Sequence, residues 1–293
     1  MSHDITTVID GLSFSECPRW HEDRLWFSDF YTSEVSSVLA DGSDRRLEAT
    51  VPNQPSGLGW LPDGRLLVVS MRDQKILRRE HDGALLLHAD LSQHARGHLN
   101  DMTVDAQGRG YVGCFGFDLM GGEPSAAAPL LRVDPDGSVT EVATDLWFPN
   151  GIVITPSGTL LVNETFGNRV TGFDVAPDGA LENRRVWAEL GPLPTEREFE
   201  KVLPQVVVAA DGSCLDAGGG LWVADATGGR LLRLVDGAID TEIETGTPVY
   251  ACALGGPDGT TLFACAAPDF FEHARRDVRE ASIIALTVDV PAA

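Results

Sequence analysis

The most informative absences in this chain of 293 residues concern membranes and nucleic acids. No apolar run approaches the ~20 residues that a membrane-spanning helix needs. The first residues, MSHDITTVIDG, lack the basic stretch and apolar core of a secretory signal. Basic residues are scarce, 22 against 44 acidic ones, and the net charge of −22 repels phosphate backbones and anionic membranes. We therefore expect a cytoplasmic protein that binds neither nucleic acid nor membrane.

Several familiar signatures are missing as well. The chain has five cysteines, an odd number, and no C-x-x-C pair, so we expect no disulfide framework and a packing role for most of them. It has no Gly-rich phosphate loop, no Ser nucleophile elbow and no dinucleotide-binding fingerprint. These absences argue against nucleotide-dependent and serine-dependent enzymes.

The chain does contain an internal repeat of six segments. Each has a leading residue, an apolar residue four positions later, and then a turn and a strand that ends in a polar or small residue. The leading residues are Glu16, Ser56, Asn100, Asn150, Asp211 and Tyr250, and the apolar ones are Trp20, Trp60, Val104, Ile154, Leu215 and Leu254. Successive leading residues are 40, 44, 50, 61 and 39 positions apart, which is typical of β-propeller blades.

The segments predict four strands per blade. In the fourth, GIVITP, TLLVNET, RVTGFDVAP and ALENRRVWAE are separated by turn residues that suit hairpins. We therefore predict one all-β domain over residues 1–293, a six-bladed propeller with blades that start near the six leading residues. The last blade lacks one strand, and ITTVIDG near the N-terminus can supply it and close the ring.

Two insertions interrupt the period. The first, residues 120–129, is rich in Gly, Pro and Ala, and the second, residues 191–204, contains a predicted short helix, TEREFEKV. Loops of this length often form lids or binding loops, and a surface insertion without function is the alternative.

The leading residues predict a metal site. In a propeller the first strand of each blade lines the central channel, so these residues converge at one end of it. The convergence brings together two carboxylates and two amide oxygens, from Glu16, Asn100, Asn150 and Asp211. Such oxygen donors suit Ca²⁺ first, with Mg²⁺, Mn²⁺, Zn²⁺ or Fe²⁺ as alternatives. Asn-Gly and Asp-Gly are also ordinary turn pairs, but turn chemistry does not place four donors at one repeat position.

The motifs SECPRW, LNDMTVDAQGR, FPNGIVITPSGTLLVNET and ADGSCLDAGGGLWVAD, in this order and spacing, resemble those of the SMP-30/gluconolactonase/luciferin-regenerating-enzyme family. The resemblance implies a six-bladed propeller with one catalytic divalent metal, usually calcium, and hydrolysis of cyclic esters, chiefly sugar lactones. It implies that Glu16, Asn150 and Asp211 are metal ligands and that Asp211 is the candidate base. It places Asn100 at the metal or substrate and Asp101 beside the substrate.

The chain departs from the pattern of the sugar lactonases at His98, where those enzymes have an arginine that holds sugar hydroxyls. Histidine offers fewer donors, so sugar specificity is open. Candidate wall residues are Phe115, Phe117, Trp147, Phe148, Phe166 and Phe270, with His273 as a further substrate contact. If several of these aromatics face the channel, the substrate is more apolar than a sugar.

We expect a lactonase in which the metal polarises the carbonyl and water attacks, with Asp211 or Asp101 as base and His98 as a proton shuttle. A nucleophilic Asp211 is the runner-up mechanism. Alternative functions are a metal-dependent phosphotriesterase or other esterase, a calcium-binding propeller without turnover, and a cyclase resembling strictosidine synthase. The sequence leaves open both the lactone and whether the protein is a monomer or a dimer.

Overall fold

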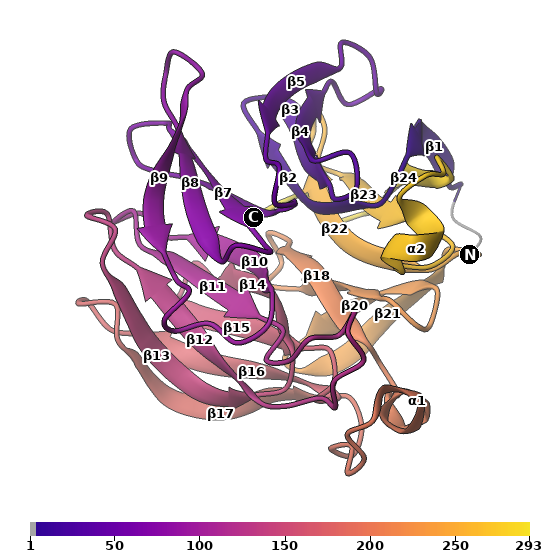
Figure 1. Cartoon of the computed structure of the whole chain (residues 1–293). Coiled ribbons are helices and arrows are strands. Elements are labelled where there is room, and N and C mark those ends of the chain that lie inside the picture. The colour runs from indigo at the N-terminus through magenta and orange to yellow at the C-terminus, as the bar shows by residue number, and fades with distance from the viewer. Residues whose placement is uncertain (1–3) are drawn as a thin grey trace.

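The computed structural model describes residues 4–293 and contains 24 strands in six antiparallel sheets of four strands each. The sheets are arranged as blades around a common axis (Figure 1). The predicted all-β, six-bladed propeller with four-stranded blades is therefore confirmed.

The blades follow one another along the chain. Blade one contains β2 (Ser15–His21), β3 (Arg24–Asp29), β4 (Glu34–Val38) and β5 (Arg46–Thr50). Blade two contains β6 (Pro55–Trp60), β7 (Leu66–Ser70), β8 (Lys75–Arg79) and β9 (Leu85–Asp90). Blade three contains β10 (Leu99–Val104), β11 (Gly110–Cys114), β12 (Ala128–Val133) and β13 (Val139–Leu146).

The second half repeats this order. Blade four contains β14 (Pro149–Ile154), β15 (Thr159–Glu164), β16 (Arg169–Val175) and β17 (Leu181–Glu189). Blade five contains β18 (Ala210–Leu215), β19 (Leu221–Asp225), β20 (Arg230–Val235) and β21 (Ala238–Glu244). Blade six contains β22 (Val249–Gly255), β23 (Thr261–Ala266), β24 (Ala281–Thr287) and β1 (Thr6–Leu12).

The N-terminal strand closes the ring. β1 pairs antiparallel with β24, so blade six has the order β22-β23-β24-β1, with three strands from the C-terminal end and one from the N-terminal end. The predicted closure is confirmed. Pairing the two ends covers the edge that β24 would otherwise expose.

Burial explains the strand sequences. Second strands such as β7 (LLVVS) and β19 (LWVAD) are buried along their whole length, because neighbouring blades cover both faces of the sheet. Outer strands such as β17 are mostly exposed and carry charged residues. The core therefore lies between the blades, near the axis, and holds the innermost strands rigidly.

The innermost strands share an irregularity that positions the site. In each, the pairing with the second strand is broken close to the leading residue; in blade four, for example, Pro149 pairs with Glu164 and regular pairing resumes at Ile152. Such a break re-aims side chains. The innermost strands also approach closely, since a Cβ added at Gly151 would lie 2.5 Å from the Asp211 carbonyl oxygen.

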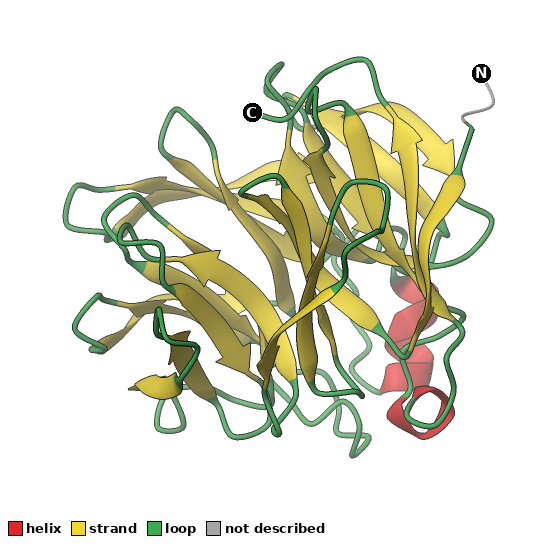
Figure 2. Ribbon diagram, turned by 90° about the horizontal axis from the view of Figure 1, so that it is seen from above, coloured by secondary structure: helices red, strands yellow, loops and turns green. Residues whose placement is uncertain are grey.

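Helices are few and short, and they gather on one side of the ring (Figure 2). The predicted helix over residues 195–202 is α-helical only at α1 (Phe199–Val202), which continues as a 3₁₀ turn, η1 (Leu203–Gln205). The Gln205 side chain accepts the Thr195 N–H at 2.7 Å and holds the first part of the segment away from helical geometry. The second helix, α2, is Glu272–Arg275. In residues 4–293, no helix has the length and apolar character needed to cross a bilayer.

Candidate functional site

The four predicted oxygen donors line one cavity of about 400 Å³. Each is the second residue of the innermost strand of its blade, and each is at most 7% exposed: Glu16, Asn100, Asn150 and Asp211. We call these four side chains the donor ring. Of the two other leading residues, Tyr250 lines the same cavity and Ser56 is fully buried outside it.

Hydrogen bonds orient the two amides of the donor ring. Asn150 Nδ2 donates to Thr165 Oγ1 at 3.1 Å, and that hydroxyl donates to the Ala210 carbonyl at 2.9 Å. Asn100 Nδ2 donates to the Pro149 carbonyl at 3.4 Å. Because protein acceptors occupy the amide nitrogens, the amide oxygens remain available to a ligand in the cavity.

The two carboxyl groups lie in an unfavourable environment. Burial raises the pKa of Glu16 to about 8 and that of Asp211 well above its usual value. Repulsion from Asp101 adds to both shifts, and the charge of Glu16 raises the pKa of Asp211 further. Glu16 Oε2 accepts only one backbone N–H, from Cys17 at 2.8 Å, and Asp211 Oδ1 is buried without a partner in residues 4–293.

This chemistry fits a hard divalent cation. Two mutually repelling buried carboxylates, an orphaned carboxylate oxygen and two free amide oxygens form a set that Ca²⁺ or Mg²⁺ binds well. No three His, Cys, Asp or Glu side chains of the described chain are grouped so as to hold a metal. The donor ring agrees with that finding, because half of its members are asparagines.

Asp101 lies outside the cavity. It is 2% exposed, and its Oδ1 accepts hydrogen bonds from Arg19 Nη2 at 2.6 Å and from the Met102 N–H at 2.8 Å. The ion pair joins blade one to blade three. The charge of Asp101 is thus matched by Arg19, whereas no side chain of the described part of the chain donates to Asp211 Oδ1.

His98 lines the cavity beside Phe115, with a distance of 5.8 Å between ring centroids. Burial lowers the pKa of His98, and the positive charge of Arg72 lowers it further. The imidazole is therefore neutral at neutral pH, with one nitrogen able to donate and one able to accept.

Three further carboxylates fix the loops that lead into the donor ring. They end the second strands of blades one, four and five, and are at most 1% exposed: Asp29, Glu164 and Asp225. We call them the loop clamps. Asp29 accepts the Phe14 N–H at 3.0 Å, and Glu164 accepts the Trp147 N–H at 2.7 Å. Each acceptor thus holds the backbone two or three residues before a donor-ring residue.

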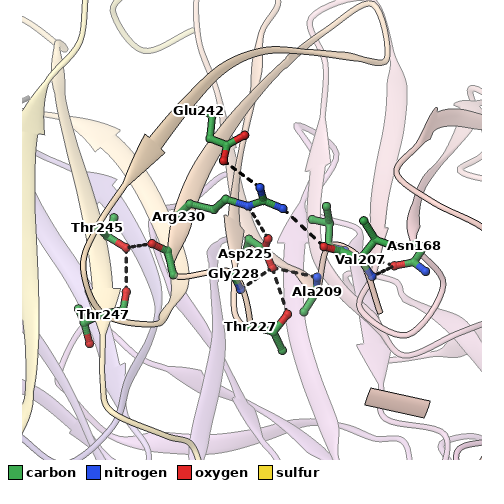
Figure 3. A network of polar contacts seen from close by, with 12 residues as sticks. Asn168, Val207, Ala209, Asp225, Thr227, Gly228, Arg230, Glu242, Thr245 and Thr247 are labelled. Atoms are coloured by element: carbon green, nitrogen blue, oxygen red, sulfur yellow. Dashed lines mark hydrogen bonds and ion pairs between the residues drawn. The ribbon is translucent and has the colours of Figure 1, made fainter. Parts of the chain in front are cut away.

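Figure 3 shows the loop clamp of blade five. Asp225 Oδ1 accepts the Ala209 N–H at 3.0 Å and the Gly228 N–H at 3.1 Å, and Oδ2 pairs with Arg230 Nε at 2.8 Å. Ala209 is two residues before Asp211. From the sequence, we noted that this strand of each repeat ends in a polar or small residue, and we assigned that residue no function. The signal that could have identified the loop clamps is that the residue is a carboxylate in only three of the six blades.

The aromatic candidates divide into two groups. Four line the cavity: Phe115, Phe148, Phe166 and Phe270. Phe117 packs behind them, 6.0 Å from Phe148 between ring centroids, and Trp147 lies under the Arg197 guanidinium at 3.8 Å. His273 lines an adjoining surface depression with Phe271 and Arg276, and it is not among the residues that line the cavity. The predicted wall positions of Phe117 and Trp147 and the predicted substrate contact of His273 are therefore not seen.

Several other residues that line the cavity were not predicted from the sequence. Phe14, Phe30, Tyr31, Met71 and Arg72 come from blades one and two, where the repeat carried no unusual signal. Both insertions also reach the cavity, with Met120 from the first and Phe199 from the second. Their length beyond the blade period was the signal that pointed to them.

Comparison with known proteins finds a matching family model and relatives named as lactonases. The family model described as SMP-30/Gluconolactonase/LRE-like region matches residues 14–267. The chain is 26% identical to the pentonolactonase XacC of Haloferax volcanii, over 90% of this chain and 85% of that protein. It is 28% identical to the 6-deoxy-6-sulfogluconolactonase of Pseudomonas putida, over 85% of this chain and 81% of that one.

A solved structure agrees in fold. The crystal structure of a calcium-binding protein, regucalcin, from Agrobacterium tumefaciens superimposes with a TM-score of 0.79 at 21% identity, covering 100% of this chain and 96% of that one. The family model covers most of the propeller, including all four residues of the donor ring. The chain belongs to the SMP-30/gluconolactonase/LRE-like family.

Proposed function

We propose that this protein is a divalent-metal-dependent lactonase that opens a cyclic ester to its hydroxy acid. The observation that carries the proposal is the donor ring, in which four buried oxygen-bearing side chains from four blades meet at one cavity, and one carboxylate oxygen has no partner in residues 4–293. Two relatives that match along most of the chain are named as lactonases, which supports the same chemistry.

Glu16, Asn150, Asp211 and Asn100 would hold the cation, with Ca²⁺ as the preferred ion. A divalent cation bound there would polarise the ester carbonyl and lower the pKa of bound water. The protein contributes a rigid, dry site, since all four side chains are buried and the loop clamps fix the backbone before three of them.

Asp211 is the base that we propose for the attacking water. Asp211 lines the cavity, and its Oδ1 accepts no hydrogen bond from residues 4–293, so this oxygen is free to take up the proton. The water oxygen forms a bond to the carbonyl carbon, the ring C–O bond breaks, and the departing alkoxide takes up a proton. His98 is neutral and lines the cavity, so it can relay that proton between its two nitrogens.

Asp101 was the other predicted base. Its Oδ1 is engaged by Arg19 and by the Met102 N–H, and this favours a supporting role behind Asn100. Cytoplasmic location, a small-molecule substrate and the absence of nucleic-acid and membrane partners stay predictions from the sequence.

The test is hydrolysis of γ- and δ-lactones and of an aryl phosphotriester before and after EDTA, with Ca²⁺, Mg²⁺, Mn²⁺, Zn²⁺ or Fe²⁺ restored. We expect lactone hydrolysis that EDTA removes and one of the cations restores. Asp211→Asn should lower kcat by at least ~100-fold, and Asp101→Asn by less than ~10-fold, since general-base catalysis is worth about 10²–10⁴.

Two results would contradict the proposal. Faster turnover of the phosphotriester would favour the phosphotriesterase alternative, and calcium binding without any turnover would favour a binding propeller. A single turnover in ¹⁸O-water separates the two mechanisms, because label in Asp211 would require a covalent intermediate.

A further inference from the structure

An almost unbroken chain of aromatic rings surrounds the cavity. Successive ring centroids lie 4.4 to 6.4 Å apart. The chain runs through Phe115, Phe148, Phe166, Phe199, Phe270, Tyr250, Phe14 and Phe30. All eight line the cavity, and we call them the aromatic wall. Blade two fills the remaining sector with Met71, Gln54 and Arg72.

Several polar side chains that line the cavity around the aromatic wall are already engaged within the protein. Arg72 Nε donates to Gln54 Oε1 at 2.8 Å, and its Nη2 lies 2.6 Å from Glu272 Oε2. The Tyr31 hydroxyl donates to the Phe270 carbonyl at 2.7 Å. A substrate with many hydroxyl groups would have to break these bonds or leave its own hydroxyls unpaired, and both are costly.

The charge of the cavity points to a neutral substrate. Four carboxyl groups line it, from Glu16, Asp211, Asp269 and Glu272, and Arg72 is the one lysine or arginine among its lining residues in the described chain. Since Arg72 is paired with Glu272, no free cation is offered to a carboxylate, sulfonate or phosphate group. An anionic substituent on the lactone would therefore find no basic side chain to pair with among these lining residues.

We propose that the substrate is a neutral lactone whose ring carries an alkyl or aromatic substituent, and that the aromatic wall binds this substituent. The inference rests on the proposed lactonase function. The ester group lies at the donor ring and the substituent packs against Phe166, Phe199 and Phe270. A cavity of about 400 Å³ is of the size that holds a small ring with such a side chain.

The test compares δ-lactones that share one ring: δ-valerolactone, its 5-alkyl derivatives up to δ-decalactone, its 5-phenyl derivative, and glucono-δ-lactone. We expect kcat/KM to rise about fourfold for each added methylene, which corresponds to ~0.8 kcal/mol of buried CH₂. Glucono-δ-lactone should be the poorest substrate. Faster hydrolysis of glucono-δ-lactone than of the alkyl lactones would overturn the inference and leave lactonase activity standing.

Binding provides a readout that does not depend on catalysis. The lactam of δ-decalactone, which the enzyme should not open, should bind at least tenfold more tightly than δ-valerolactam in calorimetry. If no lactone is hydrolysed but this preference holds, the proposed function fails and the apolar site survives. If the two lactams bind equally, the apolar site is refuted whatever the activity.

Variants locate the effect. Phe199→Ser changes a half-buried ring at the start of α1, and Phe270→Ser one in the loop before α2; both lie outside the propeller sheets, so the propeller should fold. Each should lower kcat/KM for δ-decalactone at least tenfold and change δ-valerolactone less than twofold. The matched control is Leu193→Ser, because Leu193 is an exposed apolar residue of the same insertion as Phe199 and does not line the cavity. Equal losses for both lactones, or an equal loss in the control, would contradict a substituent pocket.

Discussion

Blades one, four and five differ from blades two, three and six in how they fix the donor ring. The first group ends its second strands with the loop clamps Asp29, Glu164 and Asp225. The second group has Ser70, Cys114 and Ala266 at the same position. The backbone irregularity in the innermost strand is common to all six blades. The blade fold alone therefore does not distinguish a ligand-bearing blade; a clamp marks three of the four, and blade three carries its donor without one.

The comparison also accounts for Asn100, the donor on an unclamped blade. Its amide donates to the Pro149 carbonyl of blade four, so a neighbouring blade holds it. Pro149 in turn lies between the clamped Trp147 and Asn150. The clamp Glu164 thus positions two donors, Asn150 and Asn100. The six blades share one fold, but only four of them contribute a donor to the site.

The largest expected effect comes from removing a loop clamp. Asp225→Ala would leave Arg230 without its buried partner and free the Ala209 N–H (Figure 3). Arg230 keeps its ion pair with Glu242. Most of the loss therefore comes from the Ala209 and Gly228 N–H groups left without an acceptor, at about 1–3 kcal/mol each in the free energy of unfolding by urea. The loss should be accompanied by weaker calcium binding, because the loop before Asp211 is released.

Ser70→Ala in blade two is the matched control for this prediction. Ser70 ends an equivalent second strand but bonds Asp73 at 2.5 Å and holds no donor-ring loop. The Ser70→Ala substitution should lower the free energy of unfolding by about 1 kcal/mol, as expected for one ordinary hydrogen bond, and leave calcium binding unchanged. Similar calcium affinities in Asp225→Ala and Ser70→Ala would show that the carboxylates stabilise the blades without serving the site.

The repeat predicted the fold and the donor ring because both follow from short-range pattern. The leading residues occupy the equivalent position in the innermost strand of each blade, and closure of the ring brings these equivalent positions together. Glu16 and Asp211 could therefore be matched although they are 195 positions apart in sequence. The missing strand of blade six was visible for the same reason.

The aromatic wall and the state of Asp101 could not be predicted in this way. Phe14 and Phe270 lie in connections whose path depends on contacts with other blades, and a phenylalanine in a loop looks the same whether it faces a cavity or the core. Asp101 follows a donor directly in sequence, but its partner Arg19 comes from another blade.

The close approach of neighbouring innermost strands is a further feature of the blades. Gly57 and Gly151 occupy the same position in two of these strands, and a side chain at either position would collide with the neighbouring strand.

A smaller effect should separate donor from non-donor leading residues. With Ca²⁺ at 100 times its Kd, binding stabilises a native protein by about 2.7 kcal/mol. Glu16→Gln should lose most of that calcium-dependent gain in Tm, since one of the two carboxylates is gone. Ser56→Ala, at the same position of blade two, should keep the full gain. A full calcium response in Glu16→Gln would remove blade one from the proposed metal site.

The smallest effect concerns the two blades without a donor, two and six, which are joined across the cavity by Arg72 and Glu272. Both side chains are partly exposed, so the pair should add only about 0.2–1 kcal/mol to stability. Glu272 adjoins the segment that carries Phe270 of the aromatic wall, and this pair holds that segment against blade two. We expect Glu272→Gln to raise KM for alkyl lactones a few-fold while kcat stays within twofold.

Salt provides the internal check on that last prediction, because an exposed ion pair is screened when the Debye length falls from ~10 Å at 0.1 M to ~3 Å at 1 M salt. The wild-type KM should rise towards the Glu272→Gln value as salt is added, and the variant should not respond. Lys201→Gln removes an ion pair with Glu198 inside the second insertion, residues 191–204, and serves as the control. A wild-type KM that ignores salt, or the same KM rise in Lys201→Gln, would show that blades two and six shape the cavity through packing alone.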